Sequence, residues 1–423
     1  MSLFSLDQAA ALDAQDPLHS FRQNFVHPTI EGKKQIYFLG NSLGLQPIKT
    51  ASAINEVLSQ WGNYGVEGFF MGERPWMQMH DLMTPMLSKI VGANPHEVTV
   101  MNQLTVNLHL MMASFYRPQG KRVKILCEAK AFPSDQYMFE TYCEHLGLNP
   151  ETTIVEVMPR TGSDLISTED ILNTISSLGD ELALVLFSGI NYYTGQVFDM
   201  KAITKAAQEV GALVGFDLAH AAGNIELHLH NWNVDFACWC SYKYLNSGPG
   251  AVGGVFIHER HHHHNTPRLA GWWGYDESTR FKMEKGFVPD SGAKGWQLST
   301  PAMLLYACHL ASLELFEEAG IEQLHLKRKA LNNYLWEVLA TIDNNTKGLV
   351  RYLTPTDPNQ RGCQVSILML KNGRNMYDAL MERGLIVDWR EPDVIRLAPV
   401  PLYNSFEDIA KFGNAFYEIA QSF

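Results

Sequence analysis

The chain has 423 residues, of which 46% are hydrophobic and 18% charged, an ordinary globular composition that excludes a disordered chain. Lys and Arg total 33 against 45 Asp and Glu, and the net charge of −12 argues against nucleic acid or an anionic membrane as a partner. At about 100–200 residues per domain, this length predicts two or three domains.

The N-terminal residues are interrupted by Asp and Gln, and they lack the basic start and apolar stretch of a signal peptide. No apolar run approaches the ~20 residues of a membrane-spanning helix. The six cysteines form no CxxC pair, which is typical of reduced thiols. We therefore expect a soluble, cytoplasmic protein.

Short apolar runs alternate with helical patterns through the first two thirds of the chain. We expect strands at residues 123–127, 153–157, 182–187, 213–216, 236–240 and 255–257. Between them, Ser167 and Asp170 form a capping box that begins one helix, and Asp199 caps another that ends at Gly211. This alternation predicts an α/β fold whose mostly parallel sheet is covered by helices on both faces.

The pattern changes after residue 300. We expect a long helix over residues 301–318, a strand near 364–370 and a final helix that begins with the capping box Ser405 and Asp408. The predicted organisation is a large α/β domain over residues 51–300 and a smaller α+β domain over 301–423. Residues 1–50 are expected to pack on the smaller domain.

Two residues point to chemistry at strand ends. Asp217 ends one apolar strand, and Lys243 follows another and precedes a glycine-rich turn. A partly desolvated lysine is a good nucleophilic amine, and a buried Asp can keep a pyridine nitrogen protonated; pyridoxal phosphate (PLP) needs both. A capping Asp and a solvated Lys are the simpler interpretation of either residue alone, but together they favour a PLP site.

The glycines after Lys243 allow another interpretation. Gly248, Gly250 and Gly253 match the G-x-G-x-x-G pattern of dinucleotide-binding proteins. That motif must follow a strand and begin a helix, whereas here a strand-like run follows it. We therefore rank a dinucleotide-dependent dehydrogenase below a PLP enzyme.

Many motifs together resemble the kynureninase family of fold-type I PLP enzymes. They are FLGNSLGL at 38–45, RPW at 74–76, QLTVNLHL at 103–110, AFPSDQY at 131–137, DLAHAAGN at 217–224, SYK at 241–243, GPG at 248–250, GWWGY at 271–275, STRF at 278–281, QLST at 297–300, RGCQ at 361–364 and RLAPVPLYNSFED at 396–408. The resemblance implies a seven-stranded-type sheet in the large domain, and hydrolysis of L-kynurenine, with 3-hydroxykynurenine as a further substrate, in tryptophan catabolism and NAD biosynthesis.

The resemblance also implies residue roles. The expected catalytic residues are Lys243, Asp217 and Tyr242. The expected cofactor contacts are Leu104, Thr105, Phe132, Asp135, Ser188, Asp217, His220, Tyr242, Lys243, Trp272 and Thr300. Of these, Trp272 and Thr300 are expected to reach the cofactor of a neighbouring subunit, which implies a homodimer with shared active sites.

At the substrate end of the site, the resemblance implies that Arg396 binds the substrate carboxylate, with Asn41 and Ser42 nearby. This chain has Thr300 where other members have Asn, and Tyr275 and Val66 where some have His. The preference between kynurenine and 3-hydroxykynurenine is therefore left open.

Three alternatives remain. The histidines His258 and 261–264 could bind a metal, but without a spaced Cys or carboxylate partner we interpret them as a solvated loop and expect no metal. A cysteine desulfurase would need an exposed, low-pKa thiol, for which Cys363 is the one attractive candidate, although its strand-like surroundings favour a buried thiol. A non-catalytic PLP-binding protein ranks lower, because Lys243, Asp217 and Arg396 are all present.

Overall fold

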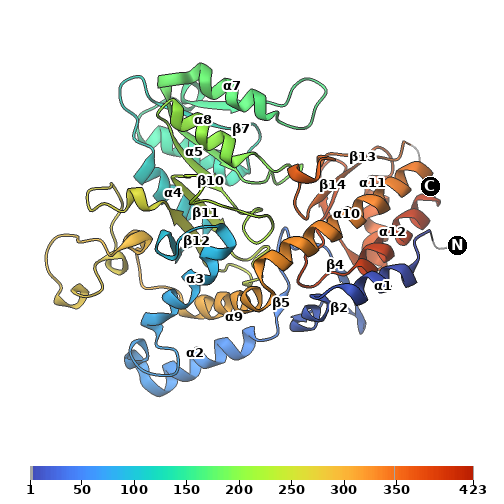
Figure 1. The fold of residues 1–423 in the computed structure, drawn as a ribbon, viewed down its shortest axis with the longest axis horizontal. Helices are drawn as coiled ribbons and strands as arrows, with labels where there is room; N and C mark the ends of the chain where they lie inside the picture. The colour runs from blue at the N-terminus through green and yellow to red at the C-terminus, as the bar shows by residue number, and fades with distance from the viewer. Residues whose placement is uncertain (1–2, 347, 423) are drawn as a thin grey trace.

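The computed structural model describes residues 3–346 and 348–422. A seven-stranded sheet with its helices forms one body and a four-stranded sheet forms another, with the long helix α10 (Ile321–Asn345) running from one toward the other (Figure 1). Both ends of the chain lie beside the smaller sheet (Figure 1).

The large sheet has the strand order β6-β12-β11-β10-β9-β7-β8. Its strands are β6 (Val98–Met101), β7 (Lys124–Glu128), β8 (Ile154–Val157), β9 (Leu182–Ser188), β10 (Leu213–Asp217), β11 (Phe236–Cys240) and β12 (Gly253–Ile257). All six predicted strands are present, with ends that differ by at most two residues, and β6 is a seventh that we did not predict.

One strand runs against the others. β12 is antiparallel to both β11 and β6, whereas the neighbouring pairs from β11 to β8 are parallel. The segment between β11 and β12, residues 241–252, contains no helix of the kind that usually forms a parallel crossover. The glycine-rich turn therefore precedes a strand and not a helix, as the sequence predicted, and this context does not fit a dinucleotide-binding motif.

Helices cover both faces of this sheet. They are α2 (Thr50–Tyr64), α3 (Met79–Val91), α4 (Leu104–Phe115), α5 (Pro133–His145), α6 (Pro150–Thr153), α7 (Thr168–Leu178), α8 (Met200–Glu209) and α9 (Met303–Ala319). Alternate residues of β9 bury on opposite faces: Val185 and Phe187 pack with residues of α3, α7, α8 and α9, whereas Leu184 and Leu186 pack with residues of α4 and α5. The prediction of an α/β sheet covered on both faces is confirmed.

The smaller sheet is antiparallel, with the order β13-β14-β17-β16. Its strands are β13 (Val350–Tyr352), β14 (Val365–Met369), β16 (Asp388–Arg390) and β17 (Val394–Leu397). Helices α10, α11 (Gly373–Glu382) and α12 (Phe406–Ala420) pack with it around a second core. The predicted capping box begins α12: the Ser405 side chain accepts from the Asp408 N–H, and Asp408 accepts from the Ser405 N–H.

The N-terminal segment contacts this second core. Helix α1 (Leu6–Gln15) packs on α12, and β4 (Ile36–Tyr37) pairs with β15 (Leu385–Ile386). The remaining short strands are β1 (Phe25–Val26), β2 (Thr29–Ile30), β3 (Lys33–Lys34) and β5 (Gln46–Pro47). Because α9 packs on α2 and α3, we propose that the smaller domain begins after α9 rather than at residue 301. Across residues 3–346 and 348–422, no helix has the length and apolarity needed to cross a membrane.

Candidate active site

A pocket of about 130 Å³ lies at the carboxyl ends of β7, β9 and β10, where parallel sheets place their ligands. Nine of the residues expected around the cofactor line it together. They are Leu104, Thr105, Phe132, Asp135, Ser188, Asp217, His220, Tyr242 and Lys243. These residues come from five separate segments of the chain, so the fold itself assembles the site.

Lys243 and His220 are hydrogen-bonded in this pocket, with 3.0 Å between the lysine Nζ and the histidine Nε2. Burial, together with the positive charges of Lys243, Arg396 and Arg390, holds the pKa of His220 well below its usual value. His220 is therefore neutral near pH 7 and accepts from Lys243. Its Nδ1 is buried and has no hydrogen-bond partner among the described residues, which fits a site completed by a bound group.

Two carboxyl groups face this lysine. The Oδ1 of Asp217 accepts a hydrogen bond from the Ala219 N–H at 2.7 Å. Burial raises the pKa of Asp217, although the Ala219 N–H and the charge of Lys243 act in the opposite direction. Burial and the nearby Asp217 raise the pKa of Asp135 well above its usual value. A ligand that presents a protonated ring nitrogen would stabilise the ionised form of such a carboxyl, as PLP does.

Two helix N-termini also line the pocket. Helix α4 follows Gln103 and α5 follows Phe132, and neither of these residues caps its helix with a side chain. The hydroxyls of Thr105 and Ser134, in the first turns of the two helices, lie 2.7 Å apart. Free N–H groups and hydroxyls at helix N-termini bind phosphate well, so these residues fit the phosphate of PLP.

Aromatic side chains form another part of the pocket. The Phe132 and Tyr192 rings meet edge to face with 5.2 Å between centroids. The Lys243 Nζ lies 5.8 Å from the centroids of both the Phe132 and the Tyr242 rings. Burial raises the pKa of the Tyr242 hydroxyl, so this group is a proton donor near pH 7. The half-exposed face of Phe132 can stack on an aromatic ligand.

Arg396 does not line the pocket but lies next to it. The side chain is 1% exposed, and its Nη1 donates to the carbonyl oxygen of Tyr192, a pocket residue, at 2.6 Å. Its Nε donates to Asp388 Oδ2 at 2.7 Å, and Nη2 is bonded to the same oxygen. Among residues 3–346 and 348–422, one N–H of each terminal nitrogen has no protein acceptor and can donate to a ligand carboxylate. Arg396 as the carboxylate-binding residue remains a prediction.

Asn41 and Ser42 lie at the boundary between the two sheets, and they do not line the pocket. The Asn41 Nδ2 donates to Gln364 Oε1 at 3.0 Å, and the Gln364 Nε2 donates to the Tyr192 carbonyl oxygen at 2.9 Å. Asn41 and Arg396 are thus linked to the pocket through Tyr192. Ser42, in contrast, donates its N–H to the Leu39 carbonyl oxygen.

Trp272 and Thr300 lie outside the pocket of their own chain. Thr300 lines an adjoining hollow of about 180 Å³, which shares Gln103 with the pocket. Trp272 is 46% exposed and contacts Phe281. Their exposed positions are compatible with the predicted contact to a neighbouring subunit, which stays a prediction.

Sequence reasoning missed several lining residues. They are Gln103, Glu128, Ser134, Ile190, Tyr192 and Ala219. Glu128 is the last residue of β7, and an acidic residue at the end of an apolar strand was the signal that could have identified it. Tyr192 follows β9 in a loop, and nothing local distinguishes it from a surface tyrosine.

The histidine-rich segment is only partly solvated, so the interpretation as a solvated loop was wrong for His258, which is 8% exposed. The buried Glu97 carboxylate lies near it and accepts hydrogen bonds from the Asn94 and Glu259 N–H groups at 2.9 Å. The Nδ1 of His230 lies 3.0 Å from both Glu97 oxygens. These bonds satisfy Glu97 and connect three segments of the chain. Glu97 is the carboxylate partner that the sequence analysis did not find for His258, and ligand atoms of Glu97, His230 and His258 lie within 4.8 Å of one another.

Cys363 is 1% exposed, and burial raises its pKa to about 12. The expectation of a buried thiol is confirmed. A cysteine desulfurase needs the opposite environment, since the thiolate is the nucleophile. The other five cysteines are buried as well.

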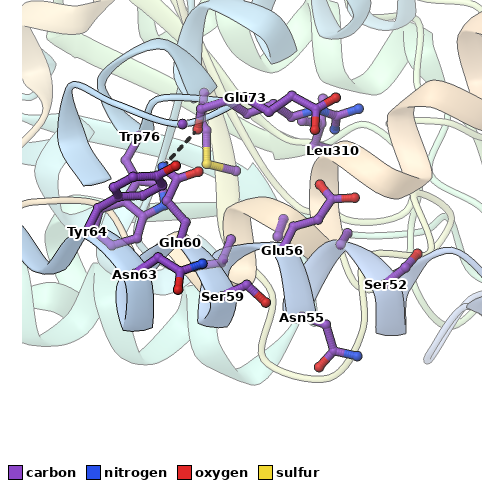
Figure 2. Close-up of a pocket in the computed structure, with 16 residues that line it drawn as sticks. Ser52, Asn55, Glu56, Ser59, Gln60, Asn63, Tyr64, Glu73, Trp76 and Leu310 are labelled. Atoms are coloured by element: carbon purple, nitrogen blue, oxygen red, sulfur yellow. Dashed lines mark hydrogen bonds between the residues drawn. The ribbon is translucent and has the colours of Figure 1, made fainter. Parts of the chain in front are cut away.

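A larger hollow of about 440 Å³ lies along helix α2, away from the strand ends. Figure 2 shows polar side chains of α2 on one side of it and Glu73 and Trp76 on the other. Gln60 ties the two sides together, because its Nε2 donates to the carbonyl oxygens of Gly68 at 2.7 Å and Arg74 at 3.3 Å. No lysine or histidine lines this hollow, and we assign no chemistry to it.

Comparison with known proteins decides the family. Residues 324–416 match the model of the kynureninase C-terminal domain. The chain is 56% identical over 410 residues to a kynureninase of Flavobacterium psychrophilum, covering 97% of this chain and 96% of the relative. It is 52% identical over 408 residues to a kynureninase of Xanthomonas campestris pv. campestris, covering 96% of each. The chain belongs to the kynureninase family.

Solved structures share the kynureninase fold at lower identity. A cysteine desulfurase from Thermococcus onnurineus NA1 is 17% identical with a TM-score of 0.76, covering 92% of this chain and 95% of that one. A cysteine desulfurase from Escherichia coli is 14% identical with a TM-score of 0.75, covering 96% and 98%. At such identities the likeness shows the fold alone, the fold-type I architecture expected from the sequence.

Proposed function

We propose that the protein is a PLP-dependent hydrolase that cleaves L-kynurenine to anthranilate and L-alanine. The observation that carries this proposal is one buried pocket containing Lys243 and Asp217, in a chain 56% identical to a kynureninase. When bound, PLP supplies an aldehyde that joins to amines and a ring that accepts electrons from the substrate.

The residues around the pocket hold the cofactor. The first turns of α4 and α5, with Thr105 and Ser134, bind its phosphate. Asp217 keeps a proton on the ring nitrogen, and Phe132 stacks on the ring. Lys243 would hold the aldehyde of PLP through its Nζ, and the Nε2 of the neutral His220 lies 3.0 Å from that nitrogen as an acceptor.

The same groups act on the substrate. Arg396 binds the α-carboxylate and so orients the Cα–H bond. The amine of Lys243 would take the Cα proton at Nζ. The hydroxyl of Tyr242 moves a proton at the γ-carbonyl oxygen. Water adds its hydroxyl to the γ-carbon and the Cβ–Cγ bond breaks. The γ-carbon becomes the carboxylate of anthranilate, and Cβ takes up a proton to give L-alanine.

Formation of anthranilate, followed by its fluorescence, tests this function. The purified, PLP-loaded protein is expected to turn over L-kynurenine, and Lys243→Ala is expected to abolish turnover. Wild-type turnover by Lys243→Ala would overturn the assignment of the lysine. Sulfide release from cysteine without anthranilate formation would favour a cysteine desulfurase instead, against the burial of Cys363.

The protein is further proposed to act as a homodimer in the cytoplasm, in tryptophan catabolism. Exposed aromatic residues support the dimer: Phe70 and Trp272 both contact Phe281, with 5.9 Å between ring centroids, and all three are about half exposed. We name Phe70, Trp272 and Phe281 the aromatic patch. Exposed apolar clusters are typical of protein interfaces. Six free cysteines support a reducing compartment.

We propose that residues near the dimer surface determine the preference between kynurenine and 3-hydroxykynurenine. Thr300, Tyr275 and Val66 differ from residues of other family members, and Val66 is 71% exposed in this chain. A comparison of kynurenine with 3-hydroxykynurenine for the wild type and for Thr300→Asn measures the contribution of the first position. A changed ratio of kcat/KM between the two substrates supports the assignment, and an unchanged ratio contradicts it.

A further inference from the structure

Glu128 is a buried pocket residue that the proposed mechanism does not use. It is the last residue of β7, lines the pocket and is 3% exposed. Among residues 3–346 and 348–422 no lysine, arginine or histidine forms an ion pair with its carboxyl group. A buried carboxyl group without a cationic partner needs another hydrogen-bond partner to offset its loss of hydration.

That partner is Ser188, at the end of the neighbouring strand β9. The Ser188 hydroxyl lies 2.5 Å from Glu128 Oε1, and the Ser188 backbone N–H donates to both carboxyl oxygens at 3.2 and 3.1 Å. Glu128 thus contacts the protein through a residue that itself lines the pocket. A change in Glu128 therefore acts on a bound cofactor through the Ser188 hydroxyl as well as directly from the pocket wall.

A serine hydroxyl has one hydrogen to give and two lone pairs to offer. An ionised Glu128 can only accept a hydrogen bond, so the Ser188 hydroxyl donates to it. The lone pairs of Ser188 Oγ then act as acceptors toward the pocket. A neutral Glu128 can donate its own proton to Oγ, which frees the Ser188 hydrogen for a group in the pocket. The backbone N–H of Ser188 donates in both states.

Glu128 is placed to change state near neutral pH. Burial raises its pKa to about 7, the negative charge of Asp217 acts in the same direction, and the hydrogen bonds from Ser188 oppose both. The titratable groups of the surrounding elements are Cys127 on β7, Asp135 on α5, Asp217 on β10, His220 after β10, and Tyr242 and Lys243 after β11.

We propose that Glu128 is a positioning residue of the cofactor site, whose proton decides whether the Ser188 hydroxyl donates to the bound cofactor or accepts from it. The inference rests on the proposed function in that it takes PLP to be the cofactor. When Glu128 ionises, its proton goes to solvent. The hydrogen bond between Glu128 and Ser188 then reverses its direction, and no atom is transferred to the cofactor. A donating hydroxyl stabilises negative charge on the cofactor, and an accepting one stabilises its protonated form.

The first test is the visible absorption of the PLP-loaded protein without substrate, titrated from pH 5 to 9. The variants are Glu128→Gln, Ser188→Ala and the double variant. Glu156→Gln is the matched control, because Glu156 is an exposed carboxylate on the adjacent strand β8. We expect a spectral step near pH 7 in the wild type and the control, and its loss in both single variants. The spectrum of the double variant should change with pH no less than the spectrum of either single variant.

A spectral step that persists in Glu128→Gln, or two single effects that simply add in the double variant, would overturn the proposal. If a variant does not bind PLP, infrared spectroscopy, which does not need the cofactor, decides the question. Infrared difference spectra of the wild type should contain a protonated-carboxyl C=O band that titrates near pH 7. This band should vanish in Glu128→Gln, shift in Ser188→Ala and persist in Glu156→Gln.

The infrared measurement also works on the protein without cofactor, so the two proposals can fail separately. Absence of PLP binding or of anthranilate would overturn the proposed function, and the carboxyl band would still report on Glu128 and Ser188. A band that titrates only below pH 5.5, or one unchanged by Ser188→Ala, would overturn the role of Glu128 while leaving the hydrolase activity intact.

Discussion

Arg396 is oriented by the residue directly across the sheet. Asp388 of β16 and Arg396 of β17 are paired positions on antiparallel strands, so their side chains lie on the same face. Asp388 accepts from Nε and Nη2 of Arg396, and also from Nε of Arg390 at 3.0 Å. One carboxylate therefore fixes the plane of the guanidinium that is proposed to bind the substrate.

Asp388→Asn is expected to raise KM for L-kynurenine about tenfold and to change kcat less than threefold, because it loosens a charge-assisted hydrogen bond that is present before the chemical step. Steady-state kinetics measure the effect. Asp378→Asn is the control, since Asp378 forms an exposed ion pair with Arg374. An unchanged KM in Asp388→Asn would contradict the assignment of Arg396.

Glu128 makes stability depend on pH in a definite direction. Its pKa is raised from 4.5 to about 7 on folding, so protonation stabilises the folded state below pH 4.5 and this contribution is lost as the pH rises through 7. The difference corresponds to at most about 3 kcal/mol. Urea unfolding of the cofactor-free protein should show the wild type losing stability between pH 5 and 8 relative to Glu128→Gln. Parallel curves would show that Glu128 titrates as in the unfolded chain.

Sequence alone identified the central residues of the pocket but not their partners. Asp217 and Lys243 follow apolar strands, and the rule that parallel sheets bind ligands at strand ends was enough to place them together. The contact between Glu128 and Ser188 depends on β7 and β9 being neighbours, although β8 lies between them in the chain. Strand order is set by long-range packing, which local patterns do not encode.

The loop after β4 packs closely against the segment that contains Lys243. The Gly44 N–H donates to the Tyr242 carbonyl oxygen at 2.8 Å. A Cβ at Gly44 would lie 2.4 Å from the Lys243 carbonyl oxygen and 2.8 Å from the Asn246 Cα, both backbone atoms. Glycine is required here because two backbones approach closely.

Gly44→Ala is therefore expected to displace the Lys243 segment and to reduce kcat/KM at least about tenfold, as misplacement of reacting groups does. The control is Gly62→Ala, because a Cβ at Gly62 meets no atom within 4 Å and alanine favours its helix α2. The two variants are compared by PLP absorbance and by anthranilate formation. Full activity in Gly44→Ala would show that this loop can move away without consequence.

The predicted strands and helices agree with the structure where the pattern is long and strongly apolar, as at Leu182–Ser188 and Phe406–Ala420. Val98–Met101 was missed because its four residues include a polar Thr99 and offer no continuous apolar run, although Thr99 is buried in the structure. The direction of β12 could not be read from its residues either. Its orientation follows from a connection without a helix, and not from the strand itself.

The whole molecule is expected to work as a pair of chains. Lys243 lies in the pocket, whereas Trp272 and Thr300 lie outside the pocket of the same chain. The sequence could suggest this arrangement only through family resemblance, because no local pattern says which chain a side chain serves. The aromatic patch around Phe281 would be covered in such a dimer.

Mixing two inactive variants tests the shared site. Lys243→Ala and Trp272→Ala are each expected to lose most activity, and after unfolding and refolding together they should recover about a quarter of wild-type activity. One of the two sites in each mixed dimer is then built from intact residues. Sedimentation velocity measures the dimer itself. Activity of the mixture equal to the average of the two variants would show that each chain completes its own site.

The burial of all six cysteines makes the molecule unusually convenient for labelling. Thiol-directed dyes react with exposed thiolates, and buried thiols with raised pKa values react slowly. A single cysteine introduced on the surface, for example in place of an exposed residue of α2, would carry a dye at one known position without removal of the native thiols. Energy transfer between such labels in mixed chains would then report the distance between subunits while substrate is being turned over.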